Sequence, residues 1–181
     1  MKSEFFEWPQ FCRSHRYVDS KCSANLNLVY PAAPYPHKNH YLLDAINLDE
    51  TTKIILTINK NEIDVNTKNV NFIGRVSREK VFDIYKTVDA LLFLSSNESL
   101  GMPILEAIKC NIPIICPYAE YTKYLKSENC FFFDIEDPIS LELAIASAKR
   151  KLMAGWWSTW DFELDLDNST SVPLDEIILN K

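Results

Sequence analysis

Two segments that are apolar at nearly every position constrain the fold of this chain more than any other feature of its sequence. Ala90–Leu94 (ALLFL) has no polar residue, and Lys53–Ile58 (KIILTI) is a second, largely apolar run. A strand without a polar side is covered on both faces, which is typical of parallel sheets. These segments therefore predict a sheet that lies between two layers of helices.

Strand-like and helix-like segments alternate from residue 25 to residue 152. Strands are expected over residues 25–30, 53–58, 70–73, 90–94, 112–116 and 130–133. Helices are expected over residues 39–48, 78–88, 103–109, 119–125 and 138–152. Short links between parallel strands require right-handed crossovers, so the prediction is an α/β fold: a doubly wound, mostly parallel, Rossmann-like sheet with helices on both faces. Ligands of such sheets bind beyond the carboxyl ends of the strands.

The two ends of the chain do not follow this alternation. We expect a lead segment over residues 1–24, the sheet domain over 25–152, and a Trp-rich, acidic tail over 153–181, anchored by packing of its tryptophans. The net charge is −6, and residues 156–181 carry −5 of it. The remainder is close to neutral and has no basic stripe, so we expect no nucleic-acid partner.

Composition excludes several classes of protein. Only three of the 181 residues are glycine, which excludes a G-x-G-x-x-G dinucleotide loop and a G-x-x-x-x-G-K-[ST] phosphate loop. No apolar run approaches the length of a transmembrane segment, and no signal peptide is evident. The five cysteines are scattered, which is typical of reduced thiols. We expect a cytoplasmic protein that could lie against the inner face of the membrane.

Two metal sites can be constructed from the sequence, and both are disfavoured. A zinc site could use Cys12, His15, Cys22 and either His37 or His40, but the chain has no paired C-x-x-C. A calcium loop could begin at Asp165 and end at Glu176, but its sixth position is Thr170 instead of glycine. We therefore expect no metal site.

The segment that follows the 90–94 strand contains the strongest candidate site. A polar turn with Glu98 leads to Gly101 and then to a predicted helix that contains Glu106. Free N–H groups at a helix start can bind an anion, and glycine permits close approach of a phosphate. Glu106 could accept hydrogen bonds from two vicinal hydroxyls, so a phosphorylated sugar is one ligand that fits. The alternative is a solvated turn, with Glu106 interacting only with the helix dipole.

At this point the sequence resembles a known family. Glu98 and Glu106, with Gly101-Met-Pro between them and Ala after Glu106, resemble the E-x₇-E motif of glycosyltransferase family 4. Further ordered similarities lie in residues 70–76 (VNFIGRV), 81–96, 112–117 and in the HKN sequence at residues 37–39. The resemblance covers about residues 25–150. It implies the C-terminal, donor-binding domain of a retaining enzyme with the two-domain GT-B fold.

The resemblance also implies a role for individual residues. Glu98 would face the donor sugar, and Lys38 would neutralise the departing diphosphate. The remaining donor-binding positions would contact the nucleotide: Glu106 on the ribose hydroxyls, Leu100, Gly101 and Met102 on the distal phosphate, and Gly74, Arg75 and Val76 beside the base. No metal or cofactor is implied, since the nucleotide-diphosphate sugar is the donor substrate. The acceptor would be a glycan or a lipid-linked molecule in surface polysaccharide synthesis.

Two departures from the family pattern leave alternatives open. The family usually has an arginine five residues before its lysine, where this chain has Ala33. Lys38 therefore acts alone, another cationic residue such as Arg78 compensates, or the phosphate site is weakened. The resemblance extends only to the donor-binding half, so we expect the acceptor-binding half to be missing from this sequence. The alternative function is a non-catalytic nucleotide-sugar-binding module, or a split half that needs a partner chain. A response-regulator-like domain shares the fold class but needs an acidic pair after the first strand, where Tyr30-Pro-Ala-Ala stands.

Overall fold

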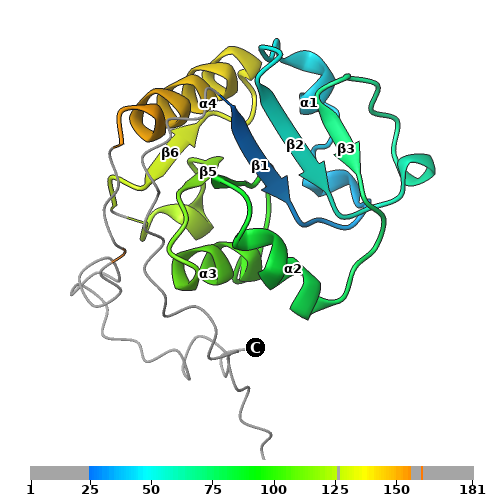
Figure 1. Ribbon diagram of the computed structural model, residues 1–181, viewed down its shortest axis with the longest axis horizontal. Coiled ribbons are helices and arrows are strands. Elements are labelled where there is room, and N and C mark those ends of the chain that lie inside the picture. Colours follow the sequence, from blue (N-terminus) through cyan, green and yellow to red (C-terminus); the bar gives the residue numbers. More distant parts are fainter. Residues whose placement is uncertain (1–24, 126, 156–159, 161–181) are drawn as a thin grey trace, which may run out of the picture.

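The computed structural model describes residues 25–125, 127–155 and 160, and its centre is a six-stranded parallel sheet (Figure 1). The strand order is β3-β2-β1-β4-β5-β6, as in Rossmann-like folds. The strands are β1 (Leu26–Tyr30), β2 (Thr52–Leu56), β3 (Val70–Phe72), β4 (Ala90–Leu92), β5 (Ile114–Pro117) and β6 (Cys130–Phe133). The predicted fold class is thereby confirmed.

Helices cover both faces of the sheet. The helices are α1 (Leu42–Ala45), α2 (Arg78–Tyr85), α3 (Met102–Lys109) and α4 (Pro138–Met153). In Figure 1, α1 and α4 lie on one side of the sheet, and α2 and α3 lie on the other. Two predicted caps are present, because the side chain of Ser77 accepts a hydrogen bond from the N–H of Lys80 and that of Asp137 accepts one from Ile139.

The core lies between these layers, as the apolar strands predict. The residues of β4 are fully buried, and Phe93 and Leu94 continue that buried run beyond the last ladder residue. β1 and β4 pair in parallel although they are far apart in the sequence. Because the chain moves outward from β1 to β3 and then returns to β4, the strand order changes direction between β1 and β4. Ligands of such sheets bind at this point, and we call the region beyond the carboxyl ends of β1 and β4 the crevice.

Two predicted helices are much shorter in the structure, and a third, expected over residues 78–88, ends at Tyr85. The helix expected over residues 39–48 is a 3₁₀ turn at Pro36–Lys38 followed by the four-residue α1, since Asn39 between them adopts a left-handed conformation with φ of 49°. The helix expected over residues 119–125 is only the 3₁₀ turn Glu120–Thr122. The hydroxyl of Thr122 donates to the carbonyl of Pro117 at 2.7 Å and accepts from the N–H of Ala119, so local side-chain bonds replace helical ones.

Most of the two terminal segments lies outside the described residues, and so do Cys12, His15, Cys22 and the disfavoured calcium loop at residues 165–176. The described Trp160 does act as an anchor. Its backbone N–H donates to the Asn111 side chain at 2.9 Å, and its indole N–H donates to the carbonyl of Ile112 at 3.0 Å. This half-buried tryptophan therefore attaches the chain after α4 to the entry of β5. Within the described part of the chain, no helix is both long enough and apolar enough to cross a membrane.

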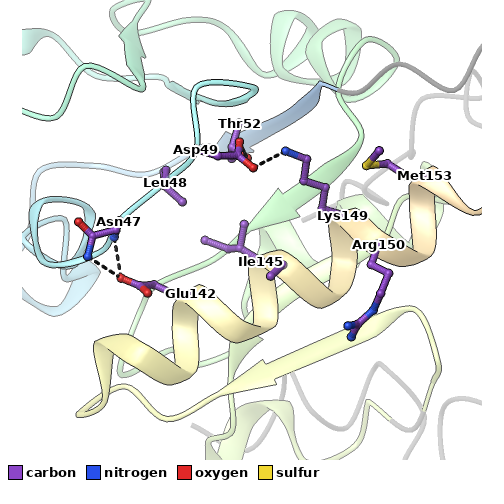
Figure 2. A pocket seen from close by; sticks show the side chains of 10 residues that line it. Asn47, Leu48, Asp49, Thr52, Glu142, Ile145, Lys149, Arg150 and Met153 are labelled. Atoms are coloured by element: carbon purple, nitrogen blue, oxygen red, sulfur yellow. Dashed lines mark hydrogen bonds and ion pairs between the residues drawn. The ribbon is translucent and has the colours of Figure 1, made fainter.

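A hollow of about 220 Å³ lies between α4 and the loop that leads into β2 (Figure 2). Two polar contacts cross the gap: Lys149 on α4 contacts Asp49 at 2.5 Å, and Glu142 accepts from the backbone N–H of Asn47 at 2.6 Å. The other oxygen of Asp49 accepts from Thr51 and Thr52. These contacts attach α4 to the amino-terminal edge of the sheet, opposite the crevice.

We expect Asp49→Asn to lower the free energy of unfolding by about 1 kcal/mol at pH 7, because water screens a pair whose acid is more than half exposed. The hydrogen bond from Lys149 holds the pKa of Asp49 well below its ordinary value. A depressed pKa stabilises the fold above the ordinary Asp value of about 4, and this stabilisation is lost as the pH falls. Urea unfolding at pH 7 and at about pH 2 should show that the difference becomes smaller in acid, because the stabilisation is lost progressively as the pH falls toward the depressed pKa of Asp49. Glu50→Gln, at an exposed neighbour, is the control; a difference as large in acid as at pH 7 contradicts the prediction.

Candidate functional site

The crevice between β1 and β4 is flanked by a lysine and a glutamate that face each other. Lys38 follows β1, Glu98 follows β4, and the ammonium of Lys38 forms an ion pair with Oε1 of Glu98. The two side chains are only 13% and 17% exposed. The fold therefore brings together two predicted site residues that lie 60 positions apart in the chain.

Hydrogen bonds lock the two loops that carry this pair. The amide of Asn39 donates to the carbonyl of Leu94 at 2.9 Å, and the N–H of Ser96 donates to the carbonyl of His37 at 2.9 Å. The buried hydroxyl of Tyr30 donates to the carbonyl of Lys38 at 2.8 Å. Because the backbone on both sides is held in this way, Lys38 and Glu98 are presented by a rigid edge of the sheet.

One aromatic ring lies near the ammonium of Lys38, and a second ring packs against the first. Its ammonium lies 5.6 Å from the centre of the Phe93 ring, and the ring of Tyr121 packs edge-on against Phe93 while its hydroxyl donates to the carbonyl of Ser95. Burial, with a contribution from Lys38, lowers the pKa of His40 to about 4. The imidazole of His40 is therefore neutral near pH 7, and the positive charge of this group belongs to Lys38.

The second glutamate of the motif lies on the buried side of α3. Glu106 is 7% exposed. Its Oε1 is 3.0 Å from Nε and 2.9 Å from Nη2 of Arg78, and its Oε2 accepts from the Tyr85 hydroxyl at 3.3 Å. Burial raises the pKa of Glu106, while Arg78 acts in the opposite direction. Arg78, considered as a substitute for the missing arginine at Ala33, is thus directed at Glu106 in this structure.

The start of α3 follows Glu98 on the loop that leaves β4. Gly101 is the N-cap residue of α3 and has φ of +62°, with Leu100 before it and Met102 as the first helical residue. This cap makes no side-chain hydrogen bond. A helix start without a capping side chain can take an anion in its place.

A cavity of about 300 Å³ lies beside the crevice, at the carboxyl ends of β1, β2 and β3. Arg75 and Val76 line it, together with Thr57, Ile58 and the loop 32–35, which ends in the exposed Tyr35. Gly74 precedes Arg75 and has φ of +75°. Arg75 forms an ion pair with Glu62. The size and the partly apolar lining of this cavity suit a flat heterocycle.

Sequence reasoning did not find every residue of this site. Tyr85 and Tyr35 were missed, and Arg78 was considered only for a phosphate. Arg78 and Tyr85 are seven residues apart on one helix, a spacing that places them on the same face and could have indicated a shared partner. No group of three or more metal-ligating side chains occurs among the residues that the structure describes.

We expect Gly101→Ala to destabilise the fold more than Gly155→Ala. Both glycines have a left-handed backbone, for which any other residue costs about 1–2 kcal/mol. An added Cβ at Gly101 lies 3.3 Å from Cδ1 of Ile104, whereas none of the described atoms lies within 4 Å of one at Gly155. Urea unfolding of the two variants separates the backbone cost from the packing cost. Equal losses show that the contact with Ile104 contributes nothing.

Comparison with solved structures identifies the fold. The catalytic domain of cholesterol-alpha-glucosyltransferase from Helicobacter pylori is similar with a TM-score of 0.61 and 15% identity, over 71% of this chain and 89% of that chain. Anabaena Alr3699/HepE, solved in complex with UDP and glucose, has a TM-score of 0.57 and 17% identity, over 80% of this chain and 41% of that one. The fold is thus the Rossmann-like α/β fold of GT-B glycosyltransferases.

Sequence comparison identifies the family. The profile of the family described as "Glycosyl transferases group 1" matches residues 60–151, about half of the chain. The chain belongs to this family. The serotype-specific mannosyltransferase WbdA of Escherichia coli is 27% identical over 78 residues, which are 43% of this chain and 10% of that protein. Uncharacterized glycosyltransferase 335 of Sulfolobus islandicus rod-shaped virus 1 is 33% identical over 36% of this chain and 21% of its own length.

Proposed function

We propose that this chain is the donor-binding domain of a retaining glycosyltransferase that moves a hexosyl group from a nucleotide-diphosphate sugar to a glycan or lipid-linked acceptor. The observation that carries the proposal is the pairing of Lys38 with Glu98 at the point where the strand order changes direction, with Glu106 on the next helix. Family membership and the mannosyltransferase activity in the name of a relative support glycosyl transfer. Surface polysaccharide synthesis is the pathway we infer from that relative and from the HKN sequence.

The parts of the donor have separate places in this proposal. The base occupies the cavity beside Arg75 and Val76, and the ribose hydroxyls bind Glu106. The diphosphate lies between Lys38 and the start of α3 at Leu100, Gly101 and Met102, and the sugar lies against Glu98. The ammonium of Lys38 and the backbone N–H groups at the start of α3 both carry positive charge, which attracts the negatively charged diphosphate.

The same arrangement supplies electrostatic catalysis without a metal. In hexosyl transfer, the bond between the anomeric carbon and the diphosphate oxygen breaks, and the diphosphate leaves with additional negative charge. A new bond forms between that carbon and the oxygen of an acceptor hydroxyl, whose proton passes to an oxygen of the leaving diphosphate. Lys38 is placed to stabilise the charge that develops on the leaving diphosphate. His40 is neutral and buried, so it takes no part as a charged acid.

Calorimetry of the full chain with uridine, guanosine and adenosine diphosphates tests the proposal. We expect one of the three to bind in a one-to-one complex, with Glu106→Gln weakening that complex and Glu50→Gln, at an exposed site opposite the crevice, leaving it unchanged. Failure of all three nucleotides to bind overturns the proposal. Turnover of the matching sugar nucleotide, measured with and without candidate partner chains, then separates an enzyme from a non-catalytic binding module.

A further inference from the structure

The carboxylate of Glu106 is held by two side chains of the neighbouring helix α2. The guanidinium of Arg78 contacts Oε1 through both Nε and Nη2, at 3.0 and 2.9 Å, and the hydroxyl of Tyr85 reaches Oε2 at 3.3 Å. The contact at Oε2 is the longest of the three, so this oxygen is the one held less tightly. A helix outside the predicted binding motif therefore sets the orientation of a motif residue.

The side chain of Arg78 is itself fixed by its surroundings. Its guanidinium lies 5.7 Å from the centre of the Phe82 ring, and Phe82 packs edge-on against Tyr85 at 5.9 Å. The Ser77 cap starts the helix immediately before Arg78. One face of α2 thus presents the guanidinium of Arg78, the supporting ring of Phe82 and the hydroxyl of Tyr85 toward α3.

We propose that Arg78 and Tyr85 are positioning residues, which keep Glu106 ionised and oriented to accept hydrogen bonds from the two ribose hydroxyls of a nucleoside diphosphate. This inference rests on the proposed function, because it takes Glu106 as the ribose ligand. A carboxylate can accept from both hydroxyls, whereas a protonated carboxyl has lost part of that capacity. Neither Arg78 nor Tyr85 needs to contact the nucleotide.

Burial makes this support necessary. Burial raises the pKa of Glu106, and Arg78 is the largest influence that lowers it. Among the described residues, Tyr85 is the other titratable group that faces this carboxylate, and its own pKa is raised first by burial and then by Glu106 and Cys110. When Arg78 is removed, the buried carboxylate of Glu106 has no cation beside it and takes up a proton instead of remaining charged. Ribose recognition then becomes dependent on pH.

The experiment compares ribonucleotides with 2′-deoxyribonucleotides. Affinities for UDP and 2′-deoxy-UDP, and for GDP and 2′-deoxy-GDP, are measured by calorimetry for the wild type and for Arg78→Met, Arg78→Lys, Tyr85→Phe and Glu106→Gln. We expect the wild type to prefer the ribose form about tenfold, as one hydrogen bond to a charged group implies. Arg78→Met should reduce this preference to less than twofold at pH 6.5 and recover it as the pH rises. Arg78→Lys should retain most of the ribose preference at pH 6.5 and at higher pH. Tyr85→Phe should show an intermediate loss of that preference.

A measurement without nucleotide keeps the inference separate from the proposed function. In the free protein, ¹³C NMR of the glutamate carboxyl groups should show Glu106 titrating at higher pH in Arg78→Met than in the wild type, with Glu106→Gln assigning the signal. An unchanged titration, or a ribose preference that survives in Arg78→Met at pH 6.5, overturns the positioning role. Equal weakening of both nucleotide forms shows a merely structural role and also overturns it. A ribose preference that survives in Glu106→Gln refutes instead the ribose assignment of the proposed function.

Discussion

Lys38→Met should weaken the binding of a nucleoside diphosphate by about 10- to 100-fold, the equivalent of roughly 1.5–3 kcal/mol for a hydrogen bond to a charged group. The reason is that Lys38 is the ammonium at the crevice, with a neutral His40 beside it and Ala33 at the position where the family carries a second base. The parent nucleoside should bind as it does to the wild type. Calorimetry with the nucleoside and with the nucleoside diphosphate measures the difference. The nucleoside is the one whose diphosphate binds best among the uridine, guanosine and adenosine diphosphates.

Two control variants make this result specific. Lys68→Met removes an exposed lysine near the opposite edge of the sheet and should change neither affinity. The double variant Lys38→Met/Glu98→Gln removes both charges of the pair, so it avoids leaving a mostly buried glutamate without its partner. It should bind the diphosphate as weakly as Lys38→Met alone. If nucleoside and nucleoside diphosphate lose affinity equally, Lys38 does not bind the diphosphate.

Glu98→Gln should change two affinities in opposite directions. In the structure Glu98 neutralises Lys38, and a diphosphate has to compete with it for the ammonium. Removing the charge of Glu98 frees Lys38, so the nucleoside diphosphate should bind about three- to tenfold more tightly, within the range of a partly buried ion pair. The sugar loses the carboxylate that accepts its hydrogen bond. The sugar conjugate should therefore gain less affinity over the nucleoside diphosphate than it does in the wild type, and turnover should also fall.

Calorimetry of the nucleoside diphosphate and of its sugar conjugate tests both parts of this prediction. Glu50→Gln, at a residue 87% exposed on its side chain, is the matched control with the same chemical change. Parallel thermal unfolding shows whether the variant remains folded. A nucleoside diphosphate affinity that falls together with that of the conjugate contradicts competition between Glu98 and the diphosphate for Lys38.

The order of strands along the chain could be predicted because local patterns are sufficient to specify a strand or a cap. The apolar run of β4, the cap residues Ser77 and Asp137, and Pro138 at the start of α4 each act within a few residues. The helix expected over residues 39–48 is shorter in the structure because a contact distant in the sequence determines its start. Asn39 adopts a left-handed conformation while its amide bonds to Leu94, which lies 55 positions further along the chain. A periodic pattern does not contain that information.

The candidate site shows the same division. Glu98, Gly101 and Glu106 belong to one continuous motif, and Lys38 and Gly74 to two others, so the sequence by itself nominated them. Only the tertiary structure decided that Lys38 pairs with Glu98, and that Arg78 binds Glu106 instead of filling the place left by Ala33. The physical reason is distance along the chain. Spacing on a strand or helix determines which face a residue occupies, but crossovers that return from β3 to β4 determine which faces meet, and therefore which charges are neutralised.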